Sequence, residues 1–311
     1  MRGKRARLLS IGDLALDIVV RAQAGVDEGT DVPGTIGFRA GGSAANVARA
    51  FAGLGGAATF VGAVGRDTTA RRLVAALRAA GVTMHAVTRP GTTTRLLVLI
   101  GPTGERSFVT DRGTADSLRP ADVRGDWLKR IDVLHLPAYS LLTPPLSAAA
   151  VTTAATAHGV GALVSVDLAS RRPLLSVGIT HTRGRIAAVA PDLLFGNLEE
   201  AAAAAGRHPV RSLLDLAPVL VVKEGAAGCR VLWRADEPGE VLEIEVATKP
   251  VATLDTTGAG DAFDAGFLHW LISNEYRPDS PRQAAALRRA ALAGHRAATR
   301  LLTSARPELV V

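Results

Sequence analysis

The chain has 311 residues, of which 48% are hydrophobic and only 4% aromatic, so it can bury a large core built mainly from Ala, Val and Leu. Its single cysteine, Cys229, excludes an internal disulfide framework and fits a reducing, cytoplasmic environment. The formal net charge of +7 comes mostly from scattered arginines without interleaved aromatic residues, which favours a solvated surface with a compositional bias over a nucleic-acid interface; an anionic small-molecule partner would also suit this charge.

The N-terminus is basic, but the segment behind it, LLSIGDLALDIVV, carries two aspartates and has no small-residue cleavage site. It therefore predicts a first strand and not a signal peptide. The longest uncharged run, residues 136–166, is interrupted by prolines, threonines, a histidine and glycines. This composition favours a helix followed by a strand, so we predict no membrane span.

Strand-like and helix-like segments then alternate along most of the chain. Short apolar runs bounded by Gly, Pro or Asp predict buried strands at 7–13, 58–65, 132–138, 161–168, 192–197 and 217–225. Helical patterns occupy 43–55, 68–81, 144–159, 198–206, 260–272 and 281–302. This alternation predicts an α/β fold with a mostly parallel sheet covered by helices on both faces.

Two segments, about 16–40 and 92–111, depart from this rhythm because short strands follow one another there without a helix. In the second, GPTGER at 101–106 is a good hairpin turn. We expect these strands to pair as a small flap off the main sheet. No repeat, linker or shift in composition divides the chain, so we predict one domain over 1–311.

The stretch DTTGAGD, residues 255–261, sets Gly-Ala-Gly between two carboxylates where a helix begins. Glycines allow close backbone approach, and a helix N-terminus offers unpaired N–H groups and a positive dipole end, which together suit an anion. An N-cap would explain one aspartate but not the glycines. No P-loop, convincing dinucleotide fingerprint, HExxH or paired CxxC motif competes with this site.

Two further clusters carry polar residues at helix starts. Gly41-Gly42 precedes a helix whose first turns carry Ser43 and Asn46, where a hydroxylated ligand can meet both backbone and side chain. Asn197 and Glu200 follow the predicted strand 192–197 and share a helix face at the strand's carboxyl end, where α/β proteins bind ligands. The alternative for this pair is a helix N-terminus with favourable acids in its first turn.

In these motifs the chain resembles the ribokinase-like (PfkB) family of carbohydrate kinases, in the family's order and over almost the whole length: GGSAANVARAFAGLG followed by VGAVGRD, then GNLEE, VVKEGAAGC and DTTGAGDAFDAGF. The resemblance implies a ribokinase-like three-layer α/β/α fold with a small β-strand lid formed by the two helix-free segments. It also implies transfer of the γ-phosphoryl group of ATP to a hydroxyl of a sugar or sugar acid.

The resemblance also implies residue roles. Asp261 is the expected base, and the amides of Gly258, Ala259 and Gly260 form the expected anion hole for the phosphoryl group. Asn197 and Glu200 would organise Mg²⁺, largely through water, and the phosphates. Asp255 and Thr257 match positions that ligate a monovalent cation such as K⁺. By the same resemblance, Asp17, Gly41, Gly42 and Asn46 are expected acceptor contacts, and Asn197, Lys223, Gly225, Gly228 and Thr257 are expected nucleotide contacts. The residues themselves add Asp13, near Asp17, and Arg112 as acceptor candidates. Arg112 stands with Arg106 and Asp111 in the lid segment, where these side chains either contact a carboxylated or phosphorylated acceptor or face solvent.

Several points stay open at this stage. Ala15 stands where many of the family's sugar kinases have a polar residue, and the C-terminal helix lacks an asparagine common near the adenine pocket. A nucleoside kinase of the same fold is the nearest alternative, although the flap offers only Phe38 and Phe108 for stacking on a base. A non-catalytic binding protein on this scaffold is a further alternative. The lid of the family also suggests a homodimer.

Overall fold

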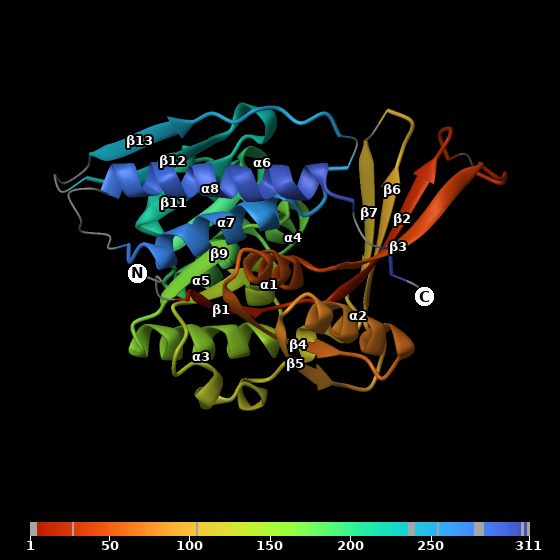
Figure 1. Ribbon diagram of the computed structural model, residues 1–311, viewed down its shortest axis with the longest axis horizontal. Coiled ribbons are helices and arrows are strands. Elements are labelled where there is room, and N and C mark those ends of the chain that lie inside the picture. Colours follow the sequence, from red (N-terminus) through yellow and green to blue (C-terminus); the bar gives the residue numbers. More distant parts are fainter. Residues whose placement is uncertain are drawn as a thin grey trace.

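A computed structural model describes residues 5–26, 28–103, 105–235, 240–253, 255–276, 283–305 and 308–309. Its larger sheet has nine strands (Figure 1), and the seven from β11 to β5 are parallel while β12 and β13 run antiparallel at one edge. In spatial order the strands are β13 (Val241–Val246), β12 (Cys229–Arg234), β11 (Val219–Lys223), β10 (Leu193–Asn197), β9 (Leu163–Asp167), β8 (Val133–Pro137), β1 (Arg7–Ile11), β4 (Ala57–Val64) and β5 (Thr83–Thr88).

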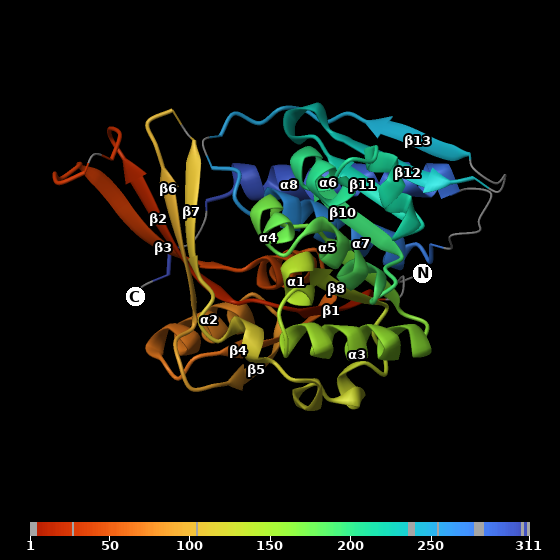
Figure 2. The same ribbon diagram turned by 180° about the vertical axis from the view of Figure 1, so that it is seen from behind.

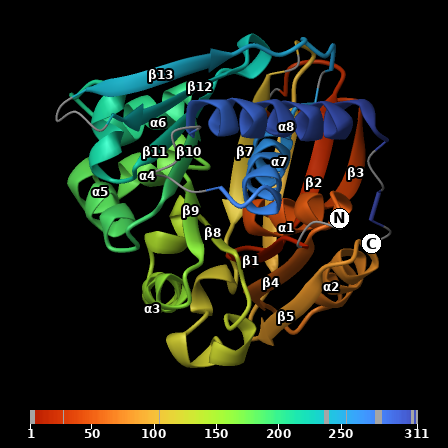
Figure 3. The ribbon, with the colours of Figure 1, turned by 60° about the vertical axis from the view of Figure 1, so that its left-hand side comes forward.

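Helices cover both faces of this sheet, as Figures 2 and 3 show from two further directions. One face carries α1 (Ser43–Gly53), α2 (Thr68–Ala79), α7 (Ala259–Ser273) and α8 (Gln283–Thr303). The other carries α3 (Leu146–Gly159), α4 (Arg171–Ser176), α5 (Ile179–Ala187) and α6 (Leu198–Ala205). Successive strand residues point to opposite faces, so Leu8 belongs to the first core and Leu9 to the second. The three-layer α/β/α prediction is confirmed.

The lid is a separate four-stranded sheet that projects from one side of the molecule (Figure 1). Its order is β3 (Gly34–Gly41), β2 (Ala15–Ala22), β6 (Thr94–Ile100) and β7 (Arg106–Asp111). β2 pairs antiparallel with β3 and parallel with β6, so the two predicted helix-free segments meet in one sheet. Gly104, in the predicted hairpin turn, lies outside the described residues.

All predicted strands and helices of the main body are present, and the last helix is described from Gln283 onward. The sequence patterns missed β5, β12, β13, α4 and α5. β13 alternates half-buried and exposed residues at the sheet edge, and α4 and α5 are short, so neither has a strong hydrophobic period. Short 3₁₀ segments also occur at Ala115–Ser117, Pro120–Asp122, Gly125–Trp127, Ala138–Leu141, Val210–Asp215 and Gly225–Ala227.

Among the helices in the described part of the chain, none combines the length and the apolar character that crossing a bilayer requires.

Candidate active site

A cavity of about 1420 Å³ lies between the lid and the carboxyl ends of the central strands. It is lined by the last residues of β9, β10 and β11, which are Asp167, Asn197 and Lys223. Open α/β sheets bind ligands at these carboxyl ends of their strands. All the predicted site residues except Gly41 and Asp255 line this cavity: Asp13, Asp17, Gly42, Asn46, Arg112, Asn197, Glu200, Lys223, Gly225, Gly228, Thr257, Gly258, Ala259, Gly260 and Asp261.

Asp261 lies in the first turn of α7 and is held by the first turn of α1. Ser43 Oγ donates to Asp261 Oδ1 at 2.6 Å, and Asn46 Nδ2 donates to Oδ2 at 2.9 Å. Arg49 Nη2 in turn donates to Asn46 Oδ1 at 2.7 Å. Asn46, predicted as an acceptor contact, therefore has both polar atoms engaged in orienting Asp261. Ser43, three residues earlier on the same helix face, is the second side chain that holds Asp261. It was noted as a polar residue at this helix start but was not among the predicted site residues.

The environment of Asp261 suits a base that works near neutral pH. Burial raises its pKa to about 6, although the hydrogen bonds from Ser43 and Asn46 lower it. A carboxylate with this pKa is ionised at pH 7 and still accepts a proton readily. Asp261 is thus a fixed, ionised proton acceptor at the N-terminus of α7.

The predicted anion hole is formed by the turn that opens α7. Gly258 has φ 76°, a left-handed conformation that glycine adopts without strain, and it precedes the first helical residue. The N–H of Ala259 donates to the carbonyl of Thr256 at 3.1 Å. One of the three predicted amides is therefore already engaged in the turn, so the helix start and its dipole carry more of the anion-binding role than expected.

Lys223 lies beside this turn in a buried cluster of carboxylates. Its Nζ donates to Asp167 Oδ1 at 3.2 Å and to both oxygens of Asp264, at 3.1 and 3.2 Å. Burial alone would lower the pKa of Lys223, but Asp167 and Asp264 raise it well above its usual value, so the ammonium stays charged. A Cβ on Gly260 would lie 3.2 Å from Nζ. The last glycine of Gly-Ala-Gly thus leaves room for this lysine.

Asn197 and Glu200 form a reciprocal cap at the start of α6. Asn197 Oδ1 accepts from the Glu200 N–H at 2.9 Å, and Glu200 Oε2 accepts from the Asn197 N–H at 2.8 Å. The two residues therefore stabilise the helix N-terminus, which was the alternative to a ligand-binding role, and both also line the cavity. Burial and then Asp167 raise the pKa of Glu200.

These residues fit a hydrated divalent cation. Glu200, Asp167 and Asp261 face one cavity, and burial and mutual repulsion raise the pKa of Glu200 and Asp261, which a nearby cation would relieve. Within the described ranges, no three His, Cys, Asp or Glu side chains converge as a metal site. An ion here would keep most of its water, as Mg²⁺ commonly does.

Asp255, predicted to ligate a monovalent cation, lies outside the cavity lining. Its carboxylate accepts a hydrogen bond from Arg39 of β3, and Arg21 of β2 lies 3.6 Å from the same oxygen. The Thr257 N–H donates to the other oxygen at 3.1 Å. The lid and the DTTGAGD turn are therefore joined by an ion pair that the sequence patterns did not predict.

The predicted acceptor end of the cavity is built around Asp13 and Asp17. A Cβ on Gly41 would lie 2.1 Å from Asp17 Oδ1, and one on Gly42 would lie 2.5 Å from the Asp13 carbonyl, so Gly41 leaves room for the Asp17 carboxylate and Gly42 for the Asp13 backbone. Asp13 Oδ1 and Asp17 Oδ1 are buried without a hydrogen-bond donor among the described residues. Burial and then Asp13 raise the pKa of Asp17 to about 7.

The nucleotide end is bounded by the turn between β11 and β12 and by α8. A Cβ on Gly228 would lie 2.2 Å from the Val246 carbonyl, so this glycine has a packing role whatever it binds. Gly225 has φ 60° and opens the same turn. His295 of α8 also lines the cavity, with Nε2 3.0 Å from the Val246 carbonyl; it was missed because no motif marks it.

Comparisons with known proteins agree with this geometry. The profile of the pfkB family carbohydrate kinases matches residues 5–305. Fructokinase-1 of Oryza sativa subsp. japonica is 31% identical over 291 residues, covering 88% of this chain and 85% of that protein.

Solved structures share the fold. Adenosine kinase from Sinorhizobium meliloti superposes with a TM-score of 0.80 at 22% identity, over 98% of this chain and 96% of that one. Fructokinase from Vibrio cholerae, with fructose, ADP and calcium bound, gives a TM-score of 0.75 at 24% identity, over 96% and 93%.

Proposed function

Because the chain belongs to the pfkB family of carbohydrate kinases and is thus a phosphotransferase that acts on a sugar hydroxyl, we propose that it transfers the γ-phosphoryl group of ATP to a hydroxyl of a small sugar. One observation carries this proposal. Asp261 is fixed by Ser43 and Asn46 at the start of α7, inside the cavity that the lid and the strand ends enclose.

Each element of this arrangement has a defined task in phosphoryl transfer. Asp261 accepts the proton of the attacking hydroxyl as the new O–P bond develops. The start of α7 and the ammonium of Lys223 stabilise charge on the transferring group. The cavity is large enough for an acceptor and a nucleotide together, and the lid strands are placed to exclude water from them.

Asn197, Glu200 and Asp167 are the residues that would hold Mg²⁺, through water and the nucleotide phosphates. When bound, the ion supplies positive charge that neutralises the phosphates. The capping contacts of Asn197 and Glu200 keep the Glu200 carboxylate at the cavity wall whether or not the ion is present.

A sugar acceptor is favoured over a nucleoside by the lid. Phe108 lines the cavity, whereas Phe38 packs against the main core. The two lid phenylalanines therefore do not form a pair of stacking surfaces for a base. The similarity to an adenosine kinase extends to the fold, at 22% identity, and the curated fructokinase relative is closer in sequence.

A homodimer through the lid is part of the proposal. Ile36 of β3 and Val109 of β7 are 65% and 66% exposed. By register, Ile36 pairs with Val20, and Val109 pairs with Leu97 of β6, so these apolar residues share the outward face of the lid. Such a face suits a second copy of the chain. Sedimentation of the wild type and of Ile36→Asp would test it; a wild-type monomer would contradict it.

The function is tested by measuring ADP formation with ATP and Mg²⁺ over a panel of sugars, sugar acids and nucleosides. We expect acceptor-dependent turnover with a sugar and none with Asp261→Asn, which serves as the control for contaminating kinases. ADP formation that no acceptor stimulates would contradict the proposal, and preferential turnover of a nucleoside would favour the alternative.

A further inference from the structure

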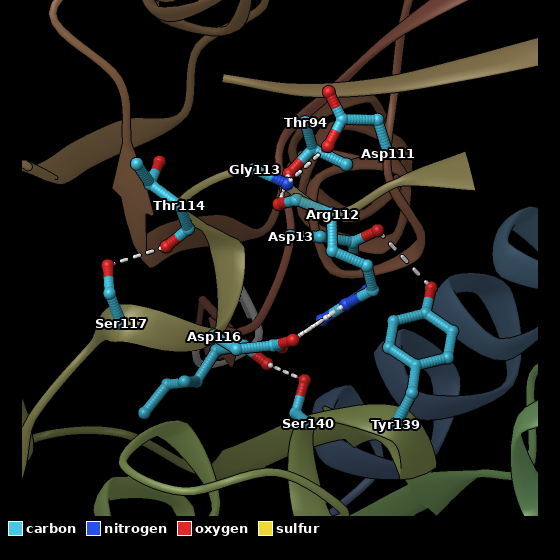
Figure 4. Close-up of polar contacts among 11 residues, drawn as sticks. Asp13, Thr94, Asp111, Arg112, Gly113, Thr114, Asp116, Ser117, Tyr139 and Ser140 are labelled. Atoms are coloured by element: carbon cyan, nitrogen blue, oxygen red, sulfur yellow. Dashed lines mark hydrogen bonds and ion pairs between the residues drawn. The ribbon is translucent and has the colours of Figure 1, made fainter. Parts of the chain in front are cut away.

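The guanidinium of Arg112 is immobilised at the acceptor end of the cavity. Asp116 accepts hydrogen bonds from its Nε, at 3.1 and 3.2 Å, and from its Nη2. The same guanidinium lies over the ring of Tyr139, 5.1 Å from the centroid. Figure 4 shows Arg112 between Asp116 on one side and Asp13 and Tyr139 on the other. Two independent contacts therefore fix one cation beside the acceptor aspartates.

Asp116 binds one of the two edges through which the Arg112 guanidinium can hold a carboxylate. Arginine binds carboxylates and phosphates best through two parallel N–H groups. Asp116 occupies the Nε/Nη2 edge, and its negative charge neutralises that of Arg112. The remaining Nη1/Nη2 edge can donate to ligand oxygens, but as part of a neutralised pair it attracts a second anion less than a free arginine would.

Carboxylates outnumber cations around this position. Asp13, Asp17 and Asp116 line the cavity together with Asp261. The nearby cations are Arg112, in the loop after β7, and Arg39 and Arg49, whose charges act on Asp17. Arg49 also donates to the Ala40 carbonyl and to Asn46. Burial raises the pKa of Asp13 and of Asp17; Arg112 opposes this rise at Asp13, and the charge of Asp13 adds to it at Asp17. A further anion would be repelled.

The same groups call for hydrogen-bond donors. The orphaned oxygens of Asp13 and Asp17 are buried acceptors, and leaving them unpaired costs free energy. Tyr139 OH points toward Asp13 Oδ2 at 3.5 Å, so the hydroxyls of a ligand would complete the set. Two other arginines of the cavity, Arg171 and Arg172, are the first residues of α4, and Arg171 lies 3.6 Å from Glu199.

We propose that Asp116 is a specificity-determining residue that restricts the acceptor to an uncharged polyhydroxyl sugar and rejects sugar acids and sugar phosphates. It does so by neutralising the charge of Arg112 and occupying one of its two carboxylate-binding edges. This inference rests on the proposed function, since it concerns the acceptor of that reaction.

The test compares kcat/KM for D-fructose with kcat/KM for 2-keto-3-deoxygluconate, a sugar acid, at fixed ATP and Mg²⁺. Wild type should prefer the neutral sugar by roughly 10–100-fold or more, as a like-charge contact implies. Asp116→Asn and Asp116→Ala should each lower this ratio at least about tenfold, through a lower KM for the acid. Asp122→Asn, which breaks the Arg89–Asp122 pair away from the cavity, should leave the ratio unchanged.

The outcomes separate the two proposals. A wild type that prefers the acid overturns the inference, as does a ratio that neither Asp116 variant changes, while sugar phosphorylation by the wild type would still support the proposed function. A wild type that phosphorylates neither compound nor any other sugar overturns the proposed function and the inference with it. The wild-type ratio needs no variant, so a misfolded Asp116 variant does not block the test.

Discussion

Each end of the cavity holds a cation paired with carboxylates, but the two pairs differ in their exposure to solvent. We call the end beside the start of α7, where Lys223 and Asp261 lie, the phosphoryl end. At the phosphoryl end, Lys223 is 13% exposed and bonds to Asp167 and Asp264, which are 5% and 0% exposed. At the acceptor end, Arg112 and Asp116 are 31% and 25% exposed. Both ends fix a cation among carboxylates, but only the first is nearly dry.

Solvation decides what each pair can do. Removing one partner of a buried ion pair leaves a charge that water cannot reach, so the pair is retained as a unit. A partly exposed pair keeps contact with water, so the loss of one partner costs little stability. We therefore expect changes at the phosphoryl end to affect turnover and stability together, and changes at the acceptor end to affect which substrate is used.

The largest effect should come from Asp261→Asn, which removes the proposed general base from the phosphoryl end. A general base contributes about 10²–10⁴-fold in rate, so kcat should fall by that order. Asparagine keeps the size of the side chain, and its amide oxygen still accepts a hydrogen bond from Ser43 or Asn46, so the melting temperature and ATP affinity should change little. Steady-state kinetics and thermal unfolding measure both. A kcat near that of the wild type would place the base elsewhere.

Lys223→Met tests whether the buried cation acts on the phosphoryl group or only holds the fold. Loss of one charge-stabilising group should lower kcat about 10²–10³-fold, and the uncompensated Asp264 should cost about 3–5 kcal/mol of unfolding free energy. Urea unfolding and initial rates report the two effects.

The matched control is the double variant Lys223→Met, Asp264→Asn, in which the buried charge is removed with its partner. It should recover part of the lost stability while kcat stays low. Recovery of kcat along with stability would mean that Lys223 has a structural role alone.

Asp17→Ala tests the acceptor end. If the buried carboxylate accepts substrate hydroxyls as we propose, loss of hydrogen bonds to a charged group costs about 1–3 kcal/mol, so the acceptor KM should rise roughly 5–150-fold. ATP affinity, measured by calorimetry, should be nearly unchanged. Asp126→Ala removes an exposed carboxylate paired with Arg124 far from the site and is the control. An unchanged acceptor KM in Asp17→Ala would show that Asp17 only shapes the lid.

As the pH falls, activity should decrease while the contribution of Asp261 to folding stability should increase. Because burial raises the pKa of Asp261 to about 6, the basic form is lost as pH falls, and kcat/KM should drop about tenfold per unit below pH 6. The raised pKa favours folding at low pH, and this contribution is lost as pH rises from about 4 through 6. Rate profiles and chemical unfolding at each pH measure both, and Asp261→Asn should flatten the part of each that this group causes.

The smallest effect should be that of potassium. A K⁺ ion at Asp255 and Thr257 would share the Asp255 carboxylate with Arg39, which already neutralises it in part. Turnover in K⁺ should therefore exceed turnover in tetramethylammonium only modestly, and Arg39→Met should increase the difference. Equal rates in both salts for wild type and variant would remove the predicted cation site.

The sequence patterns were sufficient for the main body because its signals are local. The apolar run of β10 and the Asn197–Glu200 spacing at the start of α6 lie within a few residues of one another, so each is legible without knowing the fold. The glycines of DTTGAGD marked the start of α7 for the same reason. β5 and β13, at the two edges of the sheet, were missed because their residues have mixed exposure. β12 is mostly buried but pairs antiparallel with β11, so it falls outside the strand–helix alternation from which the other strands were predicted.

The sequence by itself was sufficient to nominate the residues that we propose supply the chemistry, since Asp261 and its Gly-Ala-Gly turn stand in one short motif. The tertiary structure alone decided what holds them. Ser43 is 218 residues from Asp261, Lys223 is 41 from Asp264, and Arg39 is 216 from Asp255. No local propensity encodes such pairs, because they form only when the sheet brings α1, α7 and the lid to one edge. The electrostatics of the site, and with it the acceptor that we infer, follow from that packing.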